Sequence, residues 1–228
     1  MTQVAPRSAA VKSGDTPPNG LDAIFRPKSI AVLGVTNSPG TVPHDIFVNL
    51  LDSRFNGVVY PVAPRKKHIA GVRSYNYVLD IPDPVDLAVL VFPGAVCEMA
   101  LKQCVEKGVK SAVIISAGFR EIGPSGLERE HRIKAIAREG GMRLIGPNCL
   151  GVINTEPDVQ LNASFARAMP ATGKIGFLSQ SGALCARPCS TTPPARTSAS
   201  PSSSAWATRP TWTRSTCCTI SRPTRKRR

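Results

Sequence analysis

The stretch Ser29-Ile30-Ala31-Val32-Leu33-Gly34 begins the part of the chain that determines the fold, because it is a short apolar run that ends in glycine. Apolar residues then recur at helical spacing within residues 44–53, namely Ile46, Phe47, Leu50 and Leu51. A second strand is expected at residues 57–62. Strand, helix and strand in this order predict a βαβ unit, and hence a parallel sheet.

The same alternation continues further along the chain. Strands are expected at residues 87–92, 111–116 and 142–145, and helices at residues 95–107 and 125–139. The run at residues 87–92 is continuously apolar, as strands buried on both faces are. We therefore predict an α/β fold with a doubly wound, Rossmann-like parallel sheet. Residues 174–178 are predicted to be the first strand of a second α/β domain.

Charge is distributed unevenly along the chain. The formal net charge is +14, but residues 186–228 carry nine Lys or Arg and no acid, which leaves 20 basic and 15 acidic residues before them. This balance gives no support to nucleic acid or a membrane surface as a partner. There is no apolar run of eighteen residues and no secretory signal. The cysteines before residue 186 match no zinc motif and fit a reducing cytoplasm; they are Cys97, Cys104, Cys149 and Cys185.

The last 43 residues show no apolar period of 2 or 3.6. One interpretation is a disordered basic tail. The other is GC-rich DNA translated out of frame, since Ser, Pro, Thr, Ala and Arg dominate the segment. The third base of each codon can be read together with the first two bases of the next codon. In that frame Trp206-Ala207 must encode Gly, Trp212-Thr213 must encode Asp, and Cys217-Cys218 must encode Leu. We predict a frameshift after Cys185, with a disordered tail as its product.

The loops after the predicted strands are the candidate binding segments, because ligands bind at the carboxyl ends of parallel strands. Residues 34–41 would present backbone amides and a helix start to a phosphate, although a tight turn without a ligand fits equally well. Arg65, Lys66 and Lys67 suit a phosphorylated ligand, or are simply solvated. No acid for an NAD ribose stands here, which argues against NAD and leaves NADP open. Small residues in loops 92–95 and 116–121 permit close approach of a ligand.

Two further segments complete the pattern: Gly146-Pro147-Asn148-Cys149-Leu150-Gly151-Val152-Ile153-Asn154, and Gly173-Lys174-Ile175-Gly176-Phe177-Leu178-Ser179-Gln180-Ser181-Gly182. With the loops above, they resemble the N-terminal part of NDP-forming acyl-CoA synthetases, the succinyl-CoA synthetase alpha-subunit superfamily, over residues 21–185. The resemblance implies a CoA-binding domain. It also implies a parent reaction in which an acid, CoA and a nucleoside triphosphate give acyl-CoA, the diphosphate and phosphate through a phosphohistidine.

The resemblance assigns CoA-binding roles to Thr36, Asn37, Ser38, Pro39, Arg65, Lys66, Ile115, Ser116, Ala117 and Asn148. Ala117 stands where succinyl-CoA synthetases have an acid, which argues against succinate as substrate. The helix start with Ser179, Ser181 and Gly182 resembles the site that receives the phosphate of the phosphohistidine. The chain's own histidines, His44, His68 and His131, match no such motif, so no catalytic residue and no metal site are assigned. Cys149 is expected to be buried in its turn rather than reactive.

These inferences divide the chain into a disordered N-terminus at residues 1–20, a CoA-binding domain at 21–155, a linker and truncated second domain at 156–185, and the tail at 186–228. Two functions remain. One is the CoA-binding portion of an acyl-CoA synthetase, inactive alone, whose ATP and Mg²⁺ bind elsewhere, in a beta subunit or a C-terminal ATP-grasp domain. The other is a stand-alone CoA- or NADP-binding regulatory module. The second glycine-rich segment favours the first.

Overall fold

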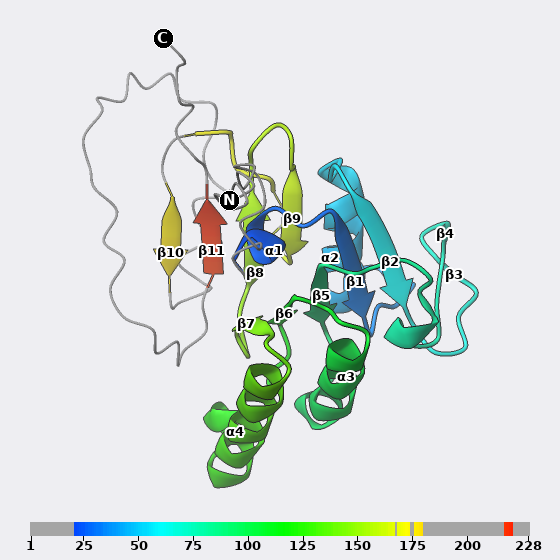
Figure 1. Ribbon diagram of the computed structural model, residues 1–228. Helices are drawn as coiled ribbons and strands as arrows, with labels where there is room; N and C mark the ends of the chain where they lie inside the picture. Colours follow the sequence, from blue (N-terminus) through cyan, green and yellow to red (C-terminus); the bar gives the residue numbers. More distant parts are fainter. Residues whose placement is uncertain (1–20, 167, 174–175, 180–216, 221–228) are drawn as a thin grey trace, which may run out of the picture.

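The computed structural model describes residues 21–166, 168–173, 176–179 and 217–220 (Figure 1). Its main body is a parallel sheet of five strands in the order β2-β1-β5-β6-β7. The strands are β1 (Ser29–Leu33), β2 (Val58–Val62), β5 (Leu87–Leu90), β6 (Ser111–Ile114) and β7 (Arg143–Ile145). The predicted α/β fold with a doubly wound parallel sheet is thus confirmed, and each of these strands lies where the sequence placed it.

Helices cover both faces of the sheet. Helix α2 (Val42–Asp52) packs on one face, and α3 (Gly94–Glu106) and α4 (Pro124–Glu139) pack on the other, side by side in Figure 1. Side chains alternate between the two layers: Ile30 and Val32 belong to the core under α2, and Ala31 and Leu33 belong to the core under α3 and α4. Burial on both faces explains why β1 and β5 have continuously apolar sequences.

Several shorter elements complete the described structure. Helix α1 (Asp22–Phe25) precedes β1, a two-stranded hairpin of β3 (His68–Ile69) and β4 (Val72–Arg73) follows β2, and two 3₁₀ turns, η1 (Val78–Asp80) and η2 (Arg120–Ile122), precede β5 and α4. The hairpin lies beyond the carboxyl end of β2 (Figure 1). Among the described residues, no helix is both long and apolar enough to cross a membrane.

The first part of the predicted linker forms β9 (Leu161–Ser164), which pairs as a packed hairpin with β8 (Gly151–Asn154) of the predicted CoA-binding domain. Leu161 and Ala163 are fully buried against the core under α2. The Asn49 amide of α2 donates to the backbone oxygens of Ser164 and Ala166, at 2.8 and 2.9 Å. The predicted boundary at residue 155 therefore falls between two paired strands, and the packed unit continues to Ala166.

The hairpin also belongs to a second sheet, of order β10-β11-β8-β9. Strand β10 (Phe177–Ser179) lies within the glycine-rich segment where a strand was predicted. Strand β11 (Cys217–Ile220) pairs with β8 in parallel and with β10 in antiparallel register. The disorder expected for residues 186–228 as a whole stays a prediction. The rest of that tail and residues 1–20 lie outside the described residues, and the frameshift stays a prediction.

Candidate functional site

The position of a ligand site follows from the order of the strands. Strand β1 lies between β2 and β5, and the chain leaves β1 toward α2 on one face and leaves β5 toward α3 on the other. The carboxyl ends of β1 and β5 therefore form a topological switch point, where open α/β sheets bind ligands. The loop at residues 34–41, called the first loop below, begins at this point.

Glycines bring the neighbouring loops into contact at this edge. A Cβ at Gly34, whose φ is +92°, would lie 2.6 Å from the Phe92 ring in the loop after β5. A Cβ at Gly94 would lie 2.8 Å from the backbone oxygen of Ala117 in the loop after β6. The loop after β7 joins them, because the Asn148 amide donates to the backbone oxygen of Ser116 at 2.9 Å. The predicted binding loops thus form one continuous edge.

Within the first loop, most polar side chains are engaged with the protein. The Thr36 and Thr41 hydroxyls lie 3.0 Å apart, and the Thr41 hydroxyl donates to the backbone oxygen of Ser38 at 2.8 Å. Thr41 precedes α2 but makes no side-chain hydrogen bond to the amides of its first turn. Ser38 and Pro39 are exposed at the tip of the loop. A helix start left without such a cap, beside an exposed turn, is suited to binding an anion.

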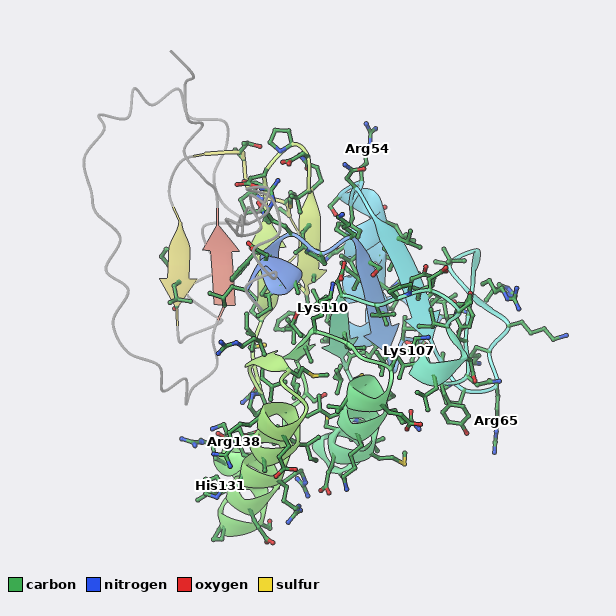
Figure 2. All side chains as sticks on the ribbon, viewed as in Figure 1. Arg54, Arg65, Lys107, Lys110, His131 and Arg138 are labelled. Carbon is green, nitrogen blue, oxygen red and sulfur yellow. The ribbon has the colours of Figure 1, made fainter. Side chains whose placement is uncertain are left out.

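The cations after β2 lie at the same edge. Arg65, Lys66 and Lys67 are exposed, and none of them forms an ion pair with another described residue. We call residues 64–67 the cation loop. Figure 2 shows Arg65 extending away from the sheet, at the opposite end of β2 from Arg54. The Arg65 amide donates to the Asn76 side-chain oxygen at 2.9 Å, which fixes the backbone of this loop.

The loop after β6 differs in character from the first loop. Ile115 and Ser116 are buried, so only Ala117 of the three predicted contacts has an exposed side chain. The Glu121 carboxylate accepts hydrogen bonds from the amides of Gly118 and Phe119. Partial burial raises the pKa of Glu121, but these backbone hydrogen bonds outweigh it and leave the pKa below its usual value. Two amides of this loop are therefore already occupied by an anion of the protein itself.

The nucleophile candidates do not converge. Cys149 is buried, as predicted, and its thiol donates to the backbone oxygen of Ile114 at 3.3 Å. Burial raises the pKa of Cys97, which keeps this thiol protonated. His131 is exposed on α4, away from Arg65 (Figure 2), and His44 lies beside Asp45 on α2. The part of the chain that the structure describes has no cluster of three potential metal ligands.

The predicted phosphate-receiving turn is described only at its first residue. Ser179 ends β10, whereas Ser181 and Gly182 lie outside the described residues. The sequence did not predict the β3–β4 hairpin or its link to the first loop. Ala70 and Gly71 form its turn, with φ of 45° and 80°. Glycine is the usual signal for such a turn, and Gly71 was the available clue.

Comparison with known proteins finds relatives that share part of this sequence. The acetate–CoA ligase (ADP-forming) of Methanocaldococcus jannaschii is 46% identical over 164 residues, which cover 72% of this chain and 22% of that protein. The alpha subunit of ADP-forming acetate–CoA ligase II of Pyrococcus furiosus is 45% identical over 164 residues, covering 72% and 35%. This chain thus spans well under half the length of either relative.

A solved structure shares both sequence and fold. The acetyl-coenzyme A synthetase 1 of Ca. Korarchaeum cryptofilum, in complex with phosphate and ADP, matches with a TM-score of 0.69 and 36% identity, covering 74% of this chain and 36% of that one. Residues 28–155 match the family described as the CoA binding domain. Because this match spans more than half of the chain, the protein belongs to the CoA-binding domain family, in the form found in NDP-forming acyl-CoA synthetases.

Proposed function

We propose that the carboxyl edge of the parallel sheet binds CoA, and that the protein is the CoA-binding portion of an NDP-forming acyl-CoA synthetase. The observation that carries this proposal is the juxtaposition of the first loop with the cation loop. Asn37 of the first loop hydrogen-bonds to the hairpin that directly follows Arg65, Lys66 and Lys67. Backbone amides at a helix start and unpaired cations together suit a ligand with several phosphate groups.

Charge at this edge favours CoA over NAD. NAD-binding domains place an acid after the second strand, where it accepts the ribose hydroxyls. Residues 63–79 contain no Asp or Glu. The 3′-phosphate and the diphosphate of CoA would instead meet cations, with Lys66 or Arg65 on the 3′-phosphate. The exposed backbone of the first loop, from Thr36 to Pro39, would hold the diphosphate.

The loop after β6 suits the uncharged arm of CoA. Ala117 has a small exposed side chain, Gly94 lies against it, and Glu121 already occupies the amides of Gly118 and Phe119. A second anion there would meet the Glu121 carboxylate. We therefore assign this loop and Asn148 to the neutral pantetheine arm, with Ile115 and Ser116 contributing only their backbone. The absence of an acid at Ala117 supports an acyl group other than succinyl.

The complete reaction needs parts beyond this edge. The proposed synthetase joins an acid to CoA while a nucleoside triphosphate is hydrolysed to the diphosphate and phosphate, in the cytoplasm. ATP and Mg²⁺ would bind to a beta subunit or an ATP-grasp domain, and the name of the P. furiosus alpha subunit supports such a partner. The turn at Ser179, Ser181 and Gly182 would receive the phosphate of the phosphohistidine.

Removing the cations tests this assignment. Lys66→Ala is expected to weaken CoA binding about tenfold, because a charge-assisted contact to phosphate is lost. Binding of dephospho-CoA, which lacks the 3′-phosphate, should change much less. Isothermal calorimetry with the two ligands measures both effects, and Arg65→Ala tested in the same way shows how the two cations share the role.

The control is Lys102→Ala, which removes an exposed lysine of α3 that pairs with Glu98. It should leave the affinities for both ligands unchanged. Equal weakening of CoA and dephospho-CoA by Lys66→Ala and by Arg65→Ala would contradict the assignment of the 3′-phosphate to the cation loop.

A further inference from the structure

The side chain of Asn37 bonds to the β3–β4 hairpin through both its nitrogen and its oxygen. Its amide nitrogen donates to the backbone oxygen of His68 at 3.1 Å, and its side-chain oxygen accepts from the amide of Ala70, also at 3.1 Å. These two hydrogen bonds fix the orientation of the carboxamide. In a flipped carboxamide the nitrogen would face the Ala70 amide, which is also a donor, and the oxygen would face the His68 oxygen, which is also an acceptor. This geometry gives the Asn37 side chain a structural role in joining the first loop to the hairpin.

Asn37 supports the turn end of a hairpin whose base is held by a backbone hydrogen bond from Tyr75 to Pro61 of β2. Strands β3 and β4 have two residues each, and an isolated two-stranded hairpin is at best marginally stable in water. Ile69 anchors one side, since it is fully buried in the same core as Val35 of the first loop. On the exposed side, between the hairpin turn and the first loop, Asn37 supplies two hydrogen bonds.

The hairpin in turn sets the position of the cation loop. Residues 64–67 lead directly into β3, and the Ser74 amide after β4 donates back to the oxygen of Lys67 at 3.0 Å. The base of the cation loop is therefore tied through the hairpin to Asn37, and through Asn37 to the first loop. Groups held at a fixed separation bind a polyanion without losing further chain entropy on binding.

We propose that Asn37 is a positioning residue: it keeps the cation loop at a fixed distance from the amides of the first loop, so that both bind one polyphosphate ligand together. The inference rests on the proposed CoA site and changes the role of one of its residues. Asn37 acts on affinity through Arg65, Lys66 and Lys67. Its effect must therefore depend on the presence of these cations.

The test is a double-mutant cycle on the full chain, with CoA affinity measured by calorimetry. Asn37→Ala alone is expected to weaken CoA about tenfold and to weaken dephospho-CoA much less. In a background with Arg65→Gln, Lys66→Gln and Lys67→Gln, the same change should weaken CoA less than twofold. Faster hydrogen exchange of the Ala70 amide in Asn37→Ala should accompany the loss, since its acceptor is gone.

Asn56→Ala is the matched control. Asn56 is also an exposed asparagine whose amide donates to a backbone oxygen, that of Asp158 at 3.0 Å, but it precedes β2 at the other end of the sheet. It should leave CoA affinity unchanged. If the wild-type chain binds no CoA, the proposed function fails and the inference fails with it. If the wild type binds CoA and Asn37→Ala weakens it equally with and without the cations, the inference alone is wrong.

Discussion

Gly146→Ala is expected to lower the free energy of unfolding by about 4 kcal/mol, the sum of a strained backbone and a steric clash. Gly146 has a φ of +91°, and an added Cβ would lie 2.4 Å from the backbone oxygen of Ile114 in β6. No change of side-chain rotamer relieves a contact with backbone. The loop after β7 would move away from β6, which breaks the hydrogen bond from Asn148 to Ser116, so CoA binding should be lost as well.

Gly141→Ala is the matched control at the other end of β7. Gly141 also has a positive φ, of +65°, but its Cβ would meet no atom within 4 Å. Only the conformational strain applies, so the expected loss is about 1 kcal/mol. Urea denaturation of the two variants measures the difference. Equal losses for Gly146→Ala and Gly141→Ala would contradict the close packing of the loops after β6 and β7.

The second prediction concerns catalytic activity. The 228-residue chain is expected to form no phosphohistidine with labelled ATP and Mg²⁺, and to make no acyl-CoA from an acid and CoA. His44 lies on α2 beside Asp45, His68 begins β3, and His131 is exposed on α4, so the three histidines are dispersed over separate elements. The matched relatives are also much longer than this chain.

Autoradiography after gel electrophoresis, with acid and alkaline washes, detects a phosphohistidine because that bond is labile to acid and stable to base. A dialysed sample without Mg²⁺ is the blank. An acid-labile labelled band, abolished by substitution of one of the three histidines, would contradict the interpretation of the chain as the CoA-binding portion alone.

The sequence predicted the central sheet well because its strands are apolar on both faces. Residues 29–34 and 87–92 have that pattern, and both became central strands. Strand β9 was missed because Leu161-Asn162-Ala163-Ser164 is short and half polar, and its burial comes from a contact with α2, more than a hundred residues earlier. Such a long-range contact leaves no local signal in the sequence.

The candidate site also has features that the sequence predicted and features that only the structure revealed. Glycines and cations marked the loops, and the parallel sheet places the carboxyl ends of its strands at one edge. The roles of individual side chains could be assigned only from the structure. Nothing in the sequence indicated that the Asn37 side chain hydrogen-bonds to His68 and Ala70, 31 and 33 residues away. Ile115 and Ser116 follow β6, yet both are buried, because the end of that strand is covered by neighbouring loops.

The central claim is that the carboxyl edge of this sheet binds CoA in preference to a dinucleotide. Calorimetric titration of the full chain with CoA, NADP and NAD under one buffer and salt condition tests it most directly. CoA should bind more tightly than NAD, because the cation loop complements its 3′-phosphate and no acid is present for the NAD ribose. It should bind more tightly than NADP, because the loop after β6 suits the pantetheine arm, which NADP lacks. Tighter binding of NADP than of CoA would contradict the account.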